Sequence, residues 1–263
     1  MSGAKRPRGT LMGEGVAEPL VFPGRAPRVL AFHGFTGTPQ EVALVVEVAR
    51  ELGLGAEAPL LPGHGARVSD LAPTRFADWL AAAEAHYARL AADGPVIVAG
   101  LSMGALLAFH LAANHPQSTL GVIAMANAMW LKSPWPTWPL KLVDRLRLPD
   151  FWMSKSAPDL GDREQRALHL TYNAQPIRAA ISMLRAGEQL SERLHRVHSP
   201  TLLLHGELDA VAPVVNACRV SVRLGTTDKR TVILPRSHHI LTRDVERETV
   251  RAEISAFLRR FSQ

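Results

Sequence analysis

The sequence predicts an α/β fold with a mostly parallel central sheet and helices on both of its faces. Short apolar runs alternate along the 263-residue chain with longer amphipathic stretches, which is the pattern of strands joined by crossover helices. Several runs are apolar at consecutive positions, as expected for strands that are buried on both faces. The length suits one large domain with a substantial core. We expect a single domain over residues 17–263, preceded by a disordered tail over residues 1–16.

The expected strands and helices follow one another in regular order. The strands lie at 28–33, 55–60, 96–101, 120–125, 201–205 and 230–234, and a short run at 19–22 adds an antiparallel edge strand. The helices are expected at 39–52, 75–92, 103–114, 213–224 and 243–261. The first helix has a start signal, since Thr38 can cap it, Pro39 suits its first turn and Glu41 lies three residues after the cap, as in a capping box.

The regular alternation breaks over about residues 128–197. This span is too long for a simple crossover between two buried strands, is rich in Trp and Pro at its start, and turns helical over 176–195. We expect an inserted helical lid. Its apolar side chains suit the wall of a pocket for an apolar ligand, with Trp130 and Met129 as predicted substrate-binding residues. The other candidates for this wall are Trp135, Trp138, Trp152, Met103 and Phe35, and packing of the lid onto the sheet explains any single Trp equally well.

Composition and charge exclude several classes of protein. The formal net charge is +6, but the basic residues are spread along the chain, and we expect no nucleic-acid partner. No apolar stretch approaches the ~20 residues that span a bilayer, and no apolar run follows the basic residues near the start, as a secretory signal requires. Cys218 is the lone cysteine and cannot form an internal disulfide. The expected location is the cytoplasm.

A nucleophile is predicted at Ser102. The segment Gly100-Leu101-Ser102-Met103-Gly104 matches G-x-S-x-G, with a buried strand before it and an apolar helix after it, which is the setting that the motif requires. Small residues on both sides let strand and helix approach closely, and the start of the helix favours a developing negative charge. The alternative is an ordinary strand–helix turn that contains a serine.

An oxyanion hole is predicted at the loop His33-Gly34-Phe35-Thr36-Gly37, which directly follows the strand at 28–33. In such folds one oxyanion donor comes from this loop and the other from the residue after the nucleophile. The backbone amides of Phe35 and Met103 are therefore the predicted donors. We interpret His33 as a structural hydrogen-bonding residue and not as a proton carrier.

An acid and a base follow the nucleophile in the order Ser, acid, His. Asp209, in the loop after the strand at 201–205, is the predicted acid, and Glu207 in the same loop is its competitor. The loop after the strand at 230–234 supplies the base, but spacing does not choose between His238 and His239. A metal site at this pair is disfavoured, because adjacent side chains rarely converge on one ion.

With these residues in place, the chain resembles the bacterial carboxylesterases close to the monoacylglycerol lipases, which have the α/β-hydrolase fold. The resemblance covers about residues 27–261 and is weakest in the lid. It is carried by HGFTG at 33–37, LPGHG at 61–65, Asp78-Trp79, GLSMG at 100–104, Asp209 and SHHILT at 237–242. Relatives usually have Ser-Gly-His in the last segment, so the resemblance implies His239 as the base and places His238 where glycine is usual. His64 and Asp78-Trp79 are interpreted as structural.

The resemblance implies a serine esterase that acts on short- to medium-chain acyl esters or monoglycerides. Ser102 would attack the ester, His239 would move the proton and Asp209 would orient the imidazole, without a metal or an organic cofactor. The partner is a small-molecule ester or a lipid, and contact with a membrane surface stays open. A thioesterase, a lysophospholipase, an acyltransferase or a carbon–carbon bond hydrolase could use the same triad. A ligand-binding protein with little turnover is the alternative from another class.

Overall fold

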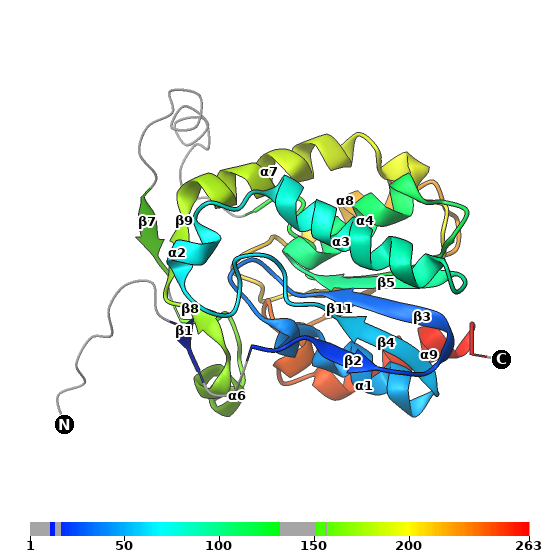
Figure 1. Ribbon diagram of the computed structural model, residues 1–263. Coiled ribbons are helices and arrows are strands. Elements are labelled where there is room, and N and C mark those ends of the chain that lie inside the picture. The colour runs from blue at the N-terminus through cyan, green and yellow to red at the C-terminus, as the bar shows by residue number, and fades with distance from the viewer. Residues whose placement is uncertain (1–10, 14–16, 132–150, 156, 263) are drawn as a thin grey trace.

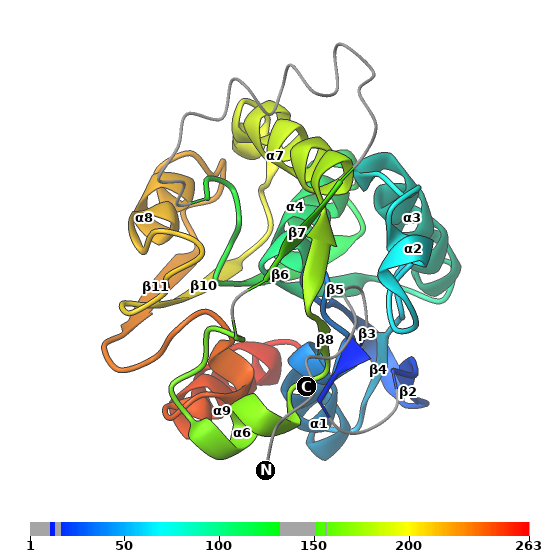
Figure 2. The same ribbon diagram turned by 90° about the vertical axis from the view of Figure 1, so that its left-hand side faces the viewer.

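The structure, a computed structural model, describes residues 11–13, 17–131, 151–155 and 157–262. It has three layers, with a central sheet between two sets of helices (Figure 1). One face is covered by α3 (Phe76–Ala91), α4 (Met103–Asn114), α7 (Ile177–Ser191) and α8 (Val215–Ser221). The other face is covered by α1 (Ala43–Glu51) and α9 (Arg247–Arg259), as Figure 2 also shows.

The central sheet has seven strands in the order β11-β10-β6-β5-β3-β4-β2. They are β2 (Leu20–Phe22), β3 (Arg25–Phe32), β4 (Leu54–Ala58), β5 (Val96–Leu101), β6 (Thr119–Met125), β10 (Thr201–Gly206) and β11 (Lys229–Leu234). Only the edge strand β2 pairs antiparallel within this sheet, with β4. The predicted mostly parallel sheet and its antiparallel edge are confirmed, with strand ends shifted by a few residues.

The consecutive apolar positions are explained by two cores, one on each face of the sheet. In β5, Val96 and Val98 belong to the core under α3 and α4. Ile97 and Ala99 alternate with them and belong to the core under α1 and α9. Full burial of a Val or Ile side chain contributes roughly 1.5–3 kcal/mol, so both faces of the strand favour apolar residues.

The start of the first helix differs from the prediction. Pro39–Val42 form a 3₁₀ turn, η1, directly before α1, and Thr38 makes no side-chain capping hydrogen bond. The predicted capping box is therefore wrong. The carboxylate of Glu41 turns away from the helix start and accepts the backbone N–H of Gly34 at 2.7 Å. A tertiary partner has displaced the local one.

The insertion is only partly helical where it is described. It contains β7 (Trp152–Ser154), α6 (Arg163–Leu168), β8 (Thr171–Tyr172), β9 (Ala174–Pro176), α7 and the 3₁₀ turn η2 (Leu194–Arg196). β7 pairs with β9, and β8 pairs with β1 (Leu11–Met12), which lies within the predicted disordered tail. Trp135 and Trp138 lie outside the described residues, and a lid role stays a prediction.

Two further features bear on the environment of the protein. Cys218 on α8 is an exposed free thiol. Among the helices that the structure describes, none is long and apolar enough to cross a bilayer.

Two other short helical elements, α2 (Val68–Leu71) and η3 (Leu241–Arg243), lie in loops that follow β4 and β11.

Candidate active site

Ser102 occupies a sharp turn between β5 and α4. Its backbone has φ 58° and ψ −114°, a conformation that costs of order 1–3 kcal/mol for a residue with a side chain. The Ser102 N–H donates to the carbonyl of Met125 at 2.9 Å. A Cβ atom on Gly104 would lie 2.0 Å from the carbonyl oxygen of Phe32, and one on Gly100 would lie 2.1 Å from the backbone of Gly104. The two motif glycines thus let α4 pack directly onto the sheet.

The acid and base candidates meet as a buried pair at the same end of the sheet. Asp209 follows β10 and His239 follows β11, and the Nδ1 of His239 lies 2.8 Å from the Oδ2 of Asp209. Asp209 is fully buried and His239 is 7% exposed. The other oxygen of Asp209 accepts the backbone N–H groups of Val211 and Ala212, both at 2.8 Å. This contact through Nδ1 leaves the Nε2 of His239 for proton exchange.

The charges of this pair stabilise each other. Burial alone would raise the pKa of Asp209, but the charge of His239 and hydrogen bonds from His205 and His239 hold the pKa below its usual value. Burial alone would lower the pKa of His239, but Asp209 raises it above the usual value, with smaller contributions from Asp159 and Glu41. The arrangement favours a cationic imidazole, which is the form that a general base reaches after it takes a proton.

Glu207 and His238, the alternatives for the acid and the base, lie outside this pair. Glu207 is exposed. His238 bonds to Asp244 instead, with its backbone N–H at 2.6 Å and its Nδ1 at 3.1 Å from the same carboxylate oxygen. His238 does not have a positive φ, so the histidine in place of the usual glycine causes no backbone strain.

The loop at 33–37 lies beside the elbow, with its amides available. A Cβ atom on Gly34 would lie 3.3 Å from the Cβ of Ser102. Within the described part of the chain, the backbone N–H groups of Phe35 and Met103 donate to no protein group. The Ser102 hydroxyl also has no hydrogen-bond partner among these residues, and such catalytic contacts are often long before substrate binds.

Three of the residues interpreted as structural, His33, His64 and Trp79, make structural contacts. The Nε2 of His33 accepts the N–H of Leu61 at 3.1 Å, and the Nε2 of His64 accepts the N–H of Thr36 at 3.2 Å. Burial holds the pKa of both histidines below the usual value. The indole of Trp79 is fully buried and donates to Pro62 at 3.1 Å. His64 thus supports the strained residue Thr36, whose φ is 66°.

The buried carboxylate of Glu41, which sequence reasoning assigned to a helix cap, lies beneath the same loop. Its Oε2 binds the Gly34 amide, and its Oε1 lies 3.2 Å from the Nε2 of His169 in the insertion. A Cβ atom on Gly37 would lie 2.2 Å from that Oε1. Burial alone would raise the pKa of Glu41, but the hydrogen bond and charge of His169 lower it to about 2.

The insertion also contacts the loop from its outer side. The hydroxyl of Thr171 donates to the carbonyl of Thr36 at 3.0 Å, and the ammonium group of Lys155 donates to the hydroxyls of Thr36 and Thr171 at 2.5 and 3.2 Å. The N–H of Tyr172 donates to the same Thr36 carbonyl at 3.3 Å. No sequence motif pointed to Lys155, Thr171 or Tyr172, because their contacts with Thr36 join segments more than a hundred positions apart.

The predicted substrate-binding residues are occupied with packing. Met129 is 1% exposed within the core under α4. The ring of half-buried Trp130 lies against the guanidinium groups of Arg219 and Arg223, at 5.7 and 5.4 Å from the ring centroid. Asn216 donates to its carbonyl at 2.7 Å. These contacts favour the packing interpretation for both residues in this arrangement.

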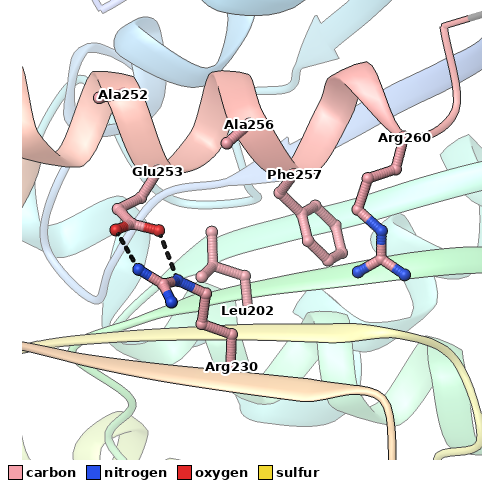
Figure 3. A pocket seen from close by; sticks show the side chains of 7 residues that line it. All are labelled: Leu202, Arg230, Ala252, Glu253, Ala256, Phe257 and Arg260. Atoms are coloured by element: carbon pink, nitrogen blue, oxygen red, sulfur yellow. Dashed lines mark hydrogen bonds and ion pairs between the residues drawn. The ribbon is translucent and has the colours of Figure 1, made fainter.

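A groove on another part of the molecule does not belong to the site. Figure 3 shows it between α9 and strands β10 and β11, with the ion pair of Arg230 and Glu253 across it. Leu202 and Arg230, which line it, lie near the amino ends of their strands. Ser102, Asp209 and His239 all follow the carboxyl ends of strands, at the opposite edge of the parallel sheet.

Comparisons with known proteins agree with this arrangement. Residues 25–246 match the family described as serine aminopeptidase, S33. The chain is 29% identical over 235 residues to the thermostable monoacylglycerol lipase of Bacillus sp. (strain H-257), covering 89% of this chain and 91% of the relative. It is 24% identical over 243 residues to the carboxylesterase of Bacillus subtilis (strain 168), covering 92% and 96%.

The structural comparison supports the same fold. A solved structure from a study of two metagenome-derived lipolytic enzymes, LipS and LipT, superimposes with a TM-score of 0.86 at 27% identity. The match covers 95% of this chain and all of the other. The chain has the α/β-hydrolase fold that the sequence predicted.

Proposed function

The chain belongs to the serine aminopeptidase S33 family and is a serine hydrolase, and from this premise we propose that it cleaves short- to medium-chain acyl esters or monoglycerides through an acyl-enzyme intermediate. The observation that carries the proposal is the buried His239–Asp209 pair at 2.8 Å, at the same sheet edge as the strained turn of Ser102. The lipase and esterase relatives favour an ester substrate over an amide.

The proposed reaction begins with attack of the Ser102 hydroxyl on the ester carbonyl carbon. His239 takes the proton at Nε2, while Asp209 holds the other ring nitrogen and stabilises the cation. The oxyanion accepts hydrogen bonds from the amides of Phe35 and Met103. Each donor of this kind typically contributes about 3 kcal/mol to transition-state stabilisation.

The second half of the reaction releases the acid. The imidazolium of His239 protonates the leaving alcohol, and the neutral ring then activates a water molecule that attacks the acyl-enzyme. The proton returns to Ser102 as the carboxylic acid leaves. Every step uses groups of this chain, and the partner is a small ester or lipid. The cytoplasmic location stays a prediction from the sequence.

The proposal is tested by hydrolysis of p-nitrophenyl esters from acetyl to palmitoyl and of a monoacylglycerol. We expect a maximum at short or medium chains and loss of the activity in Ser102→Ala. An aminoacyl p-nitroanilide tests the peptidase activity that the family description names. Faster turnover of the anilide than of every ester, or ester turnover that survives in Ser102→Ala, would contradict the proposal.

A further inference from the structure

One carboxylate of the insertion lies between the loops that carry the acid and the base. The Oδ2 of Asp159 accepts the backbone N–H of Ala210 at 2.8 Å and the backbone N–H of His239 at 3.2 Å. The carbonyl of Asp159 accepts the N–H of Ile240 at 3.3 Å. Asp159 therefore contacts the residue that follows Asp209 and also contacts His239 itself.

The base loop holds the same stretch of the insertion in return. The Oδ1 of Asp244 accepts the N–H groups of Gly161 and Asp162 at 2.8 and 3.1 Å, while its other oxygen binds His238. A Cβ atom on Gly161 would lie 2.9 Å from the ring of His238 and from the Oδ1 of Asp244. A glycine here lets the backbone approach the histidine that replaces the usual glycine.

Apolar packing fixes this stretch in place. Leu160 is fully buried in the core that also contains Ile240 and Leu241 of the base loop. Arg166 of α6 donates two hydrogen bonds to the carbonyl of Leu160. The carboxylate of Asp159 is thus held by anchors on both sides. It adds to a direct contact between the two loops that it binds, in which the backbone N–H of Leu208 donates to the carbonyl of Ser237 at 3.1 Å.

We propose that Asp159 is a positioning residue, through which the insertion sets the orientation of His239 against Asp209. The inference rests on the proposed function, since it concerns the same acid–base pair. One oxygen that receives an N–H from each loop ties the loops together beside the triad residues, and a shift of about 1 Å in a reacting group can cost about a hundredfold in rate. Through Asp159, the insertion thereby supports the acid–base pair, independently of any role as a lid over the pocket.

The charge of Asp159 adds a second effect that can be measured separately. The charged groups that act on His239 are Asp209 from the acid loop, Asp159 from the insertion and Glu41 from η1. All three raise the pKa of His239. The free base is the active form, so removal of the Asp159 charge moves the rise of kcat/KM to lower pH even as the loss of geometry lowers its plateau.

The test compares Asp159→Ala with Asp162→Ala on a p-nitrophenyl ester. Both variants remove one negative charge and the acceptor of two backbone N–H groups from the same stretch, but among the described residues the carboxylate of Asp162 accepts from Glu164 and Gln165 at the start of α6 and not from the triad loops. We expect Asp159→Ala to lower kcat about ten- to a hundredfold with little change in KM, and to shift the rise of kcat/KM to lower pH. Asp162→Ala should retain the wild-type profile.

A readout that needs no turnover separates this inference from the proposed function. The proton between His239 Nδ1 and Asp209 gives a low-field ¹H NMR signal in such pairs, and we expect it to shift in Asp159→Ala and to stay in place in Asp162→Ala. If Asp159→Glu also lowers kcat while an unfolding scan shows wild-type stability, loss of the fold is excluded as the cause. Wild-type kcat, pH profile and NMR signal in Asp159→Ala would overturn the inference. A wild-type protein inactive on every ester would overturn the proposed function alone.

Discussion

The elbow of Ser102 and the His239–Asp209 pair lie at one edge of the sheet, where we propose a single active site, but they are held in different ways. The elbow is built from consecutive residues: β5, the strained serine, two close-packing glycines and α4. The acid–base pair is held from outside, by Asp159, which lies 51 positions from Ala210 and 80 from His239. The oxyanion loop belongs with the second group, because His169 and Thr171 of the insertion support it.

The conformation at Ser102 is determined locally, whereas the relative position of the acid and the base is determined by long-range contacts. The nucleophile needs one backbone conformation, and a short motif with small residues can specify it. The relative position of an acid and a base on separate strands has no local determinant. It depends on contacts between the two loops and on groups that contact both loops at once, so the insertion contributes to the proposed site even though none of its described residues belongs to the predicted triad.

The largest expected effect tests whether the two regions act as one catalytic unit. Ser102→Ala and His239→Ala should each lower kcat on the order of 10⁵- to 10⁶-fold, and the double variant should lose no more than either alone, because triad members act together. The measurement is single-turnover and steady-state hydrolysis of the preferred p-nitrophenyl ester by all three variants.

The neighbouring histidine is the matched control. His238→Ala removes an imidazole that binds Asp244 and not Asp209, and we expect it to retain activity within about tenfold of wild type. If His238→Ala instead lost as much activity as Ser102→Ala, the assignment of the base to His239 would be wrong. Additive losses in the double variant would show that serine and histidine act in separate steps.

The second effect concerns acid stability and the support of the oxyanion loop by Glu41. The pKa of Glu41 is about 2 in the folded chain against a usual 4.5. A carboxylate whose pKa is lower in the folded than in the unfolded chain stabilises the fold at a pH above its unfolded-state pKa. This stabilisation is lost as the pH falls through the folded-state pKa. We expect the free energy of unfolding of wild type to exceed that of Glu41→Gln by about 3 kcal/mol at pH 7. This difference should disappear between about pH 5 and pH 2.

Urea unfolding of both proteins at several pH values measures this difference. Asp209 and Asp244 also have a pKa below the usual value, but they are present in both proteins and cancel in the comparison. A difference between wild type and Glu41→Gln that stays constant from pH 7 to pH 3 would mean that the effect of Glu41 is packing and not charge.

The parts of the fold and site with local determinants could be predicted from the sequence. Burial on both faces of the sheet made the strands visible as consecutive apolar runs, and their alternation with helices predicted the mostly parallel sheet that the structure has. Ser102 directly follows a predicted strand, and Asp209 and His239 lie in the loops that follow two others. Parallel strands end at one edge of a sheet, so their convergence there was predictable without a contact map.

Glu41 and Asp159, which support the two loops, could not be predicted because local sequence rules give each of them another role. Glu41 stands at the capping-box position, and local rules assign it to Thr38, yet the Gly34 amide and His169 are its partners. Asp159 lies in a stretch without helical or strand periodicity, where a carboxylate is expected to face water. Only the folded backbone brings two unpaired N–H groups to its one oxygen.

The smallest expected effect compares a glycine substitution in each region. At Ser102, φ is 58°, so Ser102→Gly relieves strain and should raise stability by about 1 kcal/mol after the entropy cost of glycine. At His238, which is not among the residues with positive φ, His238→Gly restores the usual family residue but removes the ring contact with Asp244. We expect a loss of about 1–2 kcal/mol there.

Thermal and urea unfolding of the two glycine variants and of wild type measures the expected gain in stability at Ser102 and the expected loss at His238. The contrast is sharp because the same substitution acts in opposite directions: backbone conformation decides the result at the elbow, and a side-chain contact decides it at the base loop. If His238→Gly were as stable as wild type, the bond between His238 and Asp244 would contribute nothing net. The base loop would then be held by its other contacts, which include the bonds from Arg236 and Ser237 to the carboxylate of Glu246 and the bond from His239 to Asp159.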